Sequence, residues 1–145
     1  MSRSVKSGAI NGPMRVLIVE DEALVAMEIE AMIAMAGHIV VGQADDLSST
    51  LAAIEREKPD FALVDIRLAQ GCSGIDVAAA LRARGIPVVF ATGNRPAKDR
   101  FDVALGCVQK PITDRGLASV LSVVEAVMHG GILPPLHPSI HLYHG

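Results

Sequence analysis

The chain has few aromatic residues and no apolar stretch long enough to cross a membrane. Only 3% of its 145 residues are aromatic, whereas 50% are hydrophobic, so aliphatic side chains must build the core. No apolar run approaches the roughly 20 residues that a transmembrane helix needs. Residues 1–10 also lack the continuous apolar stretch of a signal peptide. We therefore expect a cytoplasmic protein that does not span a membrane.

Cysteine and basic residues are scarce as well. Cys72 and Cys107 form neither a CxxC pair nor a metal-binding cluster, so we expect reduced thiols in the core or near the surface. The net charge of -3 leaves no basic stripe, which argues against a nucleic-acid-binding protein. A chain of 145 residues has the length of one domain with a full core.

Apolar runs alternate with helix signals between residues 14 and 129. The expected strands are continuous apolar runs, typical of strands buried on both faces, at 15–19, 39–42, 61–65, 85–90 and 107–109. Expected helices follow them at about 22–36, 46–57, 74–84, 97–104 and 114–128. This alternation predicts a doubly wound α/β domain, with a five-stranded parallel sheet and helices on both of its faces.

The two ends of the chain depart from this alternation. Residues 1–13 are small and polar and are expected to form a flexible arm before the domain at 14–129. Residues 130–145 contain three prolines and no periodicity, so we expect a coil tail. The histidines of this tail are expected to be solvated, because the prolines prevent a helix that would align them as metal ligands.

Polar side chains stand at the ends of four expected strands. Parallel strands joined by right-handed crossovers end at one edge of the sheet, where ligands bind in open α/β folds. The side chains that meet there are Glu20, Asp21, Asp65, Thr92 and Lys110. Neighbouring carboxylates repel unless a cation lies among them, and oxygen ligands without His or Cys suit Mg²⁺.

Asp65 alone is open to three interpretations: a metal ligand, a phosphate-accepting nucleophile or only a helix cap. A carboxylate nucleophile, a metal and a fixed ammonium are together the parts that in-line phosphoryl transfer needs. The other strand ends supply acidic ligands for the metal, and Lys110 supplies the ammonium. The constellation therefore favours phosphoryl transfer to Asp65.

These positions resemble the receiver domain of bacterial two-component response regulators. The resemblance rests on the run Val-Leu-Ile-Val-Glu-Asp-Glu at 16–22, the strand-end Asp65, Thr92 and Lys110-Pro111, and it covers residues 14–129. It implies the flavodoxin-like fold with strand order 2-1-3-4-5. It also implies a cis peptide at Lys110-Pro111.

The resemblance implies a role for each site residue. Asp65 would accept the phosphoryl group, Thr92 would be the switch hydroxyl, and Lys110 would contact the phosphate. Glu20, Asp21 and Asp65 would bind Mg²⁺, helped by the main-chain carbonyl of Arg67. Glu22 is then only an acid favoured by the dipole of the helix it begins.

A receiver is a phosphorelay switch in signal transduction rather than an enzyme with an external substrate. The resemblance implies a histidine kinase or a histidine phosphotransfer protein as the phosphoryl donor. It implies a downstream protein as the target. We expect a stand-alone response regulator, limited to its own phosphorylation and dephosphorylation and without an attached output domain.

Two departures from the family pattern bear on how the switch works. Receivers place Tyr or Phe three residues before the lysine, and here that residue is Cys107. The run Phe90-Ala91-Thr92-Gly93 resembles the start of the FAT GUY receiver subgroup, but Asn94-Arg95 does not continue its motif. We therefore expect the activation signal to travel through residues 93–99.

Two alternative functions follow from the same residues. The missing aromatic residue leaves open an unphosphorylated pseudo-receiver that serves only as an interaction module. An aspartyl-phosphate hydrolase is disfavoured, because such enzymes carry a second Asp two residues after the nucleophile and this chain has Arg67 there.

Two of the expected helices are apolar on more than one side, which indicates either deep burial or an interface. For the helix at 22–36 we expect Val25, Ile29, Met32 and Ala36 to face the core. The residues left on its other side are Leu24, Met27, Ala31 and Met35. We expect the kinase or phosphotransfer partner on this side.

The helix at 114–128 has the same character. Its core stripe is Leu117, Val120, Leu121, Val124 and Met128. Its other side is apolar too, so we expect a homodimer through this helix.

Overall fold

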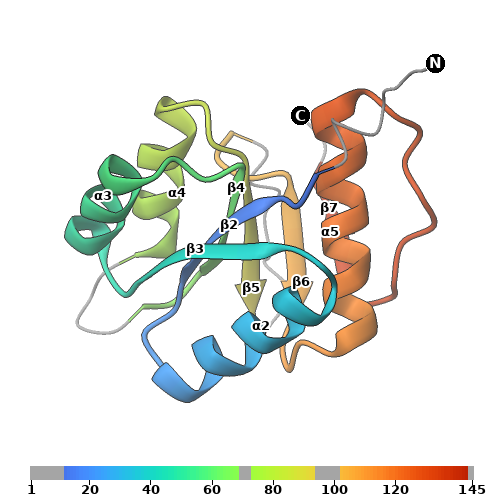
Figure 1. Cartoon of the computed structure of the whole chain (residues 1–145), viewed down its shortest axis with the longest axis horizontal. Coiled ribbons are helices and arrows are strands. Elements are labelled where there is room, and N and C mark those ends of the chain that lie inside the picture. Colours follow the sequence, from blue (N-terminus) through green and yellow to red (C-terminus); the bar gives the residue numbers. More distant parts are fainter. Residues whose placement is uncertain (1–11, 69–72, 94–101, 144–145) are drawn as a thin grey trace.

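In the computed structural model, the described residues are 12–68, 73–93 and 102–143, and they form a layered α/β domain (Figure 1). The strands are β2 (Arg15–Val19), β3 (Ile39–Ala44), β4 (Phe61–Asp65), β5 (Val88–Thr92), β6 (Gly106–Gln109) and β7 (Ile140–Leu142). The helices are α2 (Ala23–Met35), α3 (Leu47–Arg56), α4 (Gly74–Ala83) and α5 (Asp114–His129). Among these residues, no helix is long and apolar enough to cross a membrane.

The strands form one sheet in the order β3-β2-β4-β5-β6-β7. The first five are parallel and have the predicted 2-1-3-4-5 order, so the expected flavodoxin-like fold is confirmed. The sixth strand, β7, pairs with β6 in the antiparallel direction. It is an addition that the sequence did not predict.

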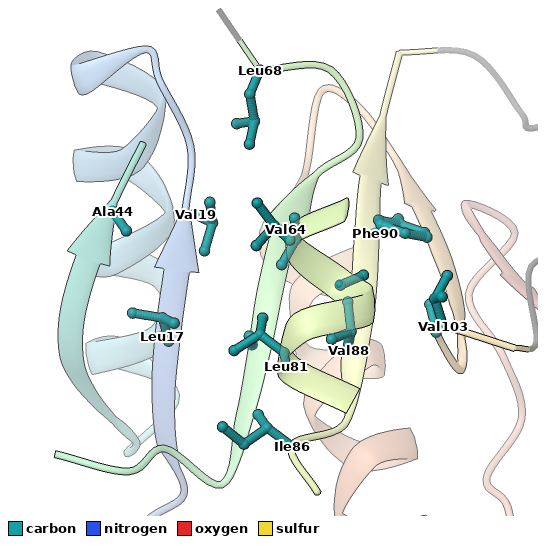
Figure 2. Packing of buried hydrophobic residues seen from close by; sticks show 14 of the residues in the cluster. Leu17, Val19, Ala44, Val64, Leu68, Leu81, Ile86, Val88, Phe90 and Val103 are labelled. Atoms are coloured by element: carbon teal, nitrogen blue, oxygen red, sulfur yellow. The ribbon is translucent and has the colours of Figure 1, made fainter. Parts of the chain in front are cut away.

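The alternation of side chains along each strand divides the core into two layers. Val16 and Ile18 of β2 pack with residues of α2 and α5 on one face of the sheet. Leu17 and Val19 pack with residues of α3 and α4 on the other. Figure 2 shows this second layer, to which α4 contributes Leu81 and the strands β4 and β5 contribute Val64 and Val88. Since both faces are covered, the strands are continuous apolar runs.

Local signals set most element boundaries where the sequence predicted them. Asp46 caps α3 in a capping box: its side chain accepts a bond from Ser49 N, and its own N–H donates to the Ser49 hydroxyl. Gly37 follows α2 with φ 90°, a left-handed conformation that favours glycine. β4 has the predicted bounds Phe61–Asp65.

Two predictions about boundaries and burial were wrong in part. The expected strand at 85–90 begins only at Val88 and continues to Thr92, because Pro87 has no N–H to donate to a neighbouring strand. In α2, Ile29 is buried as expected and Val25 and Met32 pack against the core while partly buried. Ala26 and Ile33 are also buried, however, and Ala36 is exposed, so the core stripe is wider and slightly rotated. Apolar residues surround this helix and left its orientation ambiguous.

The tail was expected to be coil, and this is wrong for its last part. Residues 131–137 have no helix or strand, but Ile140–Leu142 form β7. Ile140 and Tyr143 are buried in the core.

Several expectations fall on residues outside the described ranges. They are the arm over residues 1–11, Cys72, and nearly all of the proposed signal path at 93–99. Most of the expected helix at 97–104 also lies outside them, and the described residues 102–103 form a turn.

Candidate functional site

The carboxyl edge of the sheet brings the predicted polar residues together. Glu20 directly follows β2, Asp65 ends β4, Thr92 ends β5, and Lys110 directly follows β6. Glu20, Asp65 and Thr92 are all buried, whereas Asp21 is exposed. Buried charged side chains are rare without partners, so their contacts define what this edge can do.

Lys110 links the two buried carboxylates. Its Nζ lies 2.9 Å from Oε1 of Glu20 and 3.2 Å from Oδ2 of Asp65. The ammonium therefore neutralises part of the repulsion between two acids that come from different strands.

Main-chain N–H groups hold the other oxygen of each carboxylate. Arg67 N donates to Oδ1 of Asp65 over 3.0 Å, and Glu22 N donates to Oε2 of Glu20 over 3.1 Å. Each side chain is thus fixed at both oxygens, which preorganises the site before any ligand enters.

Burial shapes the electrostatics of the pair. Burial raises the pKa of Glu20 above its usual value, and this outweighs the bonds from Lys110 and Glu22 N. Burial alone would lower the pKa of Lys110, but its bond to Glu20 and the charge of Asp65 more than compensate, so the pKa is raised. Lys110 is therefore a permanent cation at neutral pH.

Glu20, Asp21 and Asp65 also form a cluster that suits a metal ion. Each offers one carboxylate oxygen, and these three oxygens lie within 4.8 Å of one another. An all-oxygen set that is partly open to solvent fits Mg²⁺, which keeps several water ligands. The raised pKa of Glu20 also favours a metal site, because a bound cation would stabilise the charged carboxylate that burial disfavours.

Thr92 and Lys110 are coupled through the main chain. Lys110 N donates to Thr92 O over 2.8 Å, and the Lys110-Pro111 peptide is cis, as the resemblance implied. The strand end that presents the hydroxyl is therefore bonded to the residue that presents the ammonium.

Two further outcomes concern residues next to the site. The contact of Arg67 with Asp65 is made by its N–H, and the metal-binding role of its carbonyl stays a prediction. Cys107 is buried in the same core layer as Phe90 and Tyr143, so a ring from the tail packs in the layer where the family's usual aromatic residue is missing.

Gly74 is a positioning residue that the sequence reasoning missed. A Cβ at this position would lie 2.2 Å from Asp65 O and 2.7 Å from Ile66 Cα. Only glycine lets the start of α4 approach the end of β4 so closely. The available signal was the Ser73-Gly74 pair at the helix start, where Ser73 caps α4.

A groove of about 300 Å³ lies beside the site, between α2 and the segment after β6. It is lined by Val25, Ile29 and Met32 on α2 and by Lys110 and Ile112 across from them. The groove is largely apolar, with Glu22 and Glu28 also on its wall, and it shares Lys110 with the site.

Comparison with known proteins identifies the family. Residues 16–122 match the response regulator receiver domain family. Among curated proteins, the phyllosphere-induced regulator PhyR of Methylorubrum extorquens is 36% identical over 117 residues. That alignment covers 74% of this chain and 42% of the relative, so the chain spans less than half the length of this protein.

Solved structures agree. The receiver domain of PhyR from Erythrobacter litoralis superimposes with a TM-score of 0.71 at 30% identity, covering 90% of this chain and 100% of that chain. PhyR from Bartonella quintana, described as an anti-anti-sigma factor, gives a TM-score of 0.67 at 32% identity over 84% of this chain and 51% of that one. The acidic cluster is typical of the Mg²⁺ site of receivers. The chain belongs to the response regulator receiver domain family.

Proposed function

We propose that the chain accepts a phosphoryl group on Asp65 from a phosphohistidine on a kinase or phosphotransfer protein, and that this switches its protein partners. The observation that carries the proposal is the Lys110 ammonium, 2.9 Å from Glu20 and 3.2 Å from Asp65. A pseudo-receiver has no need to keep a partly buried ammonium between two buried acids, because buried ion pairs often add little to the stability of a fold.

The contacts of Asp65 suit a nucleophile. An oxygen of Asp65 attacks the phosphorus while the bond to the donor nitrogen breaks, and the electron pair of that bond stays on the donor. Arg67 N holds Oδ1 of Asp65, which orients the carboxylate. Lys110 then serves as the cation for phosphoryl oxygens. When bound at Glu20, Asp21 and Asp65, Mg²⁺ supplies further charge neutralisation.

Thr92 is the residue we assign to reporting the event. It ends β5 beside the site, and a phosphoryl oxygen on Asp65 would provide an acceptor for its hydroxyl. Because Thr92 O is bonded to Lys110 N, a shift at either residue is passed to the other. The strand ends of β5 and β6 therefore respond together.

The donor protein is expected to dock on α2. Leu24, Met27 and Met35 are large, apolar and exposed on this helix, and Lys110 lines the groove beside it. A partner that covers this surface would bring its phosphohistidine to the open side of the acidic cluster. The output is a changed protein–protein interaction, in keeping with the description of the Bartonella quintana relative as an anti-anti-sigma factor.

The proposal is tested by incubating the wild type and Asp65→Ala with a small phosphodonor and Mg²⁺ and weighing the intact proteins. We expect one phosphoryl group on the wild type and none on the variant. Asp45→Ala is the matched control, because Asp45 is exposed nearby and its side chain accepts a bond from the Ser49 hydroxyl rather than from Lys110. This variant should gain the phosphoryl group normally.

A short-lived phosphoryl group is distinguished by titration with beryllofluoride, followed by backbone NMR shifts at Thr92 and Lys110. If the wild type shows neither a mass gain nor a beryllofluoride response, the chain is an unphosphorylated interaction module and the proposal is wrong.

A further inference from the structure

The C-terminal segment of the chain folds back onto the domain. We call residues 131–143 the strap. It leaves the end of α5, returns toward the start of that helix and ends as β7 on the edge of the sheet (Figure 1). Its contacts show a defined docking surface made of β6 and α5.

The main chain of β6 holds the strap at both ends of the strand. Gln109 N donates to Ser139 O and Tyr143 N donates to Leu105 O, both over 2.9 Å. Between these bonds, Cys107 lies opposite His141. β7 therefore completes hydrogen bonds along an edge that would otherwise be open to another strand.

α5 holds the strap by its first turns. His137 N donates to the Ser119 hydroxyl over 3.1 Å. Val123 lies one turn further along the same side of the helix and is buried. The strap thus lies along the side of α5 that the core does not use.

Two glycines shape this docking surface. A Cβ on Gly106 would lie 2.4 Å from His141 O, and one on Gly116 would lie 3.1 Å from the Ser139 hydroxyl. Neither glycine has a positive φ that would explain it by conformation alone. The surface is therefore fitted to the backbone of this particular segment.

The first half of the strap has a different character. Residues 131–136, which we call the hinge, contain no helix or strand. Three large apolar side chains of the hinge are exposed: Ile132, Leu133 and Leu136. Ile132 is 95% exposed. A hinge with unburied apolar side chains gains from any arrangement that packs it against another surface.

We propose that the docking surface of β6 and α5 also accepts the strap of a second copy, so that two chains exchange their straps reciprocally. Each chain then makes the same contacts as before, so the exchange itself costs little. The two hinges come together in the dimer and bury their apolar side chains. This assembly involves neither Asp65 nor the metal cluster, so it stands independently of phosphoryl transfer.

The length of the hinge provides the test. Eleven residue steps of α5 separate Ser119 from Gly130, about 16 Å of helix. Seven steps from Gly130 to His137 reach about 25 Å when extended, enough to return to Ser119. Deletion of residues 132–134 leaves four steps, which reach about 14 Å only when fully extended, so the return of the strap to its own domain is strongly disfavoured.

We expect this deletion variant to be a dimer by light scattering, whereas the variant with Gly-Ser-Gly at 132–134 stays largely monomeric. The second variant has the same loss of apolar side chains but the original length. It therefore separates hinge length from hinge composition.

A disulfide identifies the strand that occupies the surface. In a Cys72→Ser background, His141→Cys places a thiol opposite Cys107, with Cα atoms about 5.5 Å apart in such a hydrogen-bonded pair. We expect cross-links between chains in the deletion variant. In the full-length chain, refolding at low concentration should give this disulfide within single chains. Refolding at high concentration should give a fraction of the same disulfide between two chains.

The outcomes divide clearly. Cross-linked dimers of the deletion variant support exchange. A monomer, or a dimer without the cross-link, overturns it. If the deletion variant does not fold, the full-length chain decides: cross-links only within single chains, even after refolding at high concentration, also overturn the proposal.

Discussion

The helices α2 and α5 have similar apolar sequences but differ in how far the side away from the core is buried. Each is apolar on more than its core side. In α5 part of the second side is covered, since Val123 is only 2% exposed, whereas Val127 near the end of the helix is 44% exposed. In α2 the second side stays open, with Leu24, Met27 and Met35 exposed by 67%, 62% and 89%.

The contrast shows what an apolar pattern can and cannot say. It indicates that a helix face favours burial, but the covering surface can come from a distant part of the same chain or from a partner. On α5 the strap of the same chain lies against part of this side. On α2, next to the acidic cluster, an open surface suits a donor protein.

The largest expected effect compares one neutral polar substitution on each helix. Val123→Gln should lower the free energy of unfolding by about 2–4 kcal/mol, because it puts an amide into an apolar site. Met27→Gln should change it by less than about 0.5 kcal/mol, because that side chain is exposed. Urea unfolding measures both, and equal losses would mean that the two faces do not differ as described.

A smaller effect is expected at the helix starts. Thr113 caps α5 through a 3.0 Å bond from Gly116 N, whereas Glu22, which precedes α2, makes no side-chain cap bond. Thr113→Ala should cost about 1 kcal/mol of stability. Glu22→Ala should cost less than about 0.5 kcal/mol, since only its dipole interaction is lost. Thermal unfolding of the pair checks this, and the reverse order would contradict the assigned caps.

The smallest expected effect has the opposite sign and concerns Glu20, the acid that directly follows β2. The folded state raises the pKa of Glu20. The protonated side chain therefore stabilises the folded state at pH values below its unfolded pKa, near 4.5, and this contribution is lost as the pH rises through the folded pKa. At neutral pH the charged side chain is therefore a cost, and Glu20→Gln should stabilise the metal-free protein slightly.

The same variant should lose most of the stabilisation that Mg²⁺ gives the wild type. Urea unfolding at several pH values, with and without Mg²⁺, measures both effects. Glu28→Gln, on the exposed part of α2, is the control and should change neither. A Glu20→Gln protein less stable than wild type at neutral pH would show that the pairing with Lys110 outweighs the cost of burial.

Much of the fold could be predicted because its signals are local. β4 was predicted with its observed bounds, since Phe61–Asp65 is a continuous apolar run that ends in an acid. The site followed from topology, because parallel strands place Glu20, Asp65 and Lys110 at one edge whatever their loops do.

The missed features depend on contacts between distant residues. β7 has only three residues, too few for a periodic pattern, and it exists because Gly106 leaves room for its backbone. Gly74 likewise has a meaning only when α4 lies against the end of β4. The buried face of α2 was ambiguous, because an apolar ring of side chains fits several orientations equally well.

Tyr143 turns the scarcity of aromatic residues into an optical probe. It is the single tyrosine of a chain without tryptophan, and it is buried at the end of the strap. Tyrosine fluorescence and near-ultraviolet circular dichroism in the tyrosine band therefore come from this one position. The unmodified protein thus carries a spectroscopic label whose signal follows the docking of its own strap, in real time and without a dye.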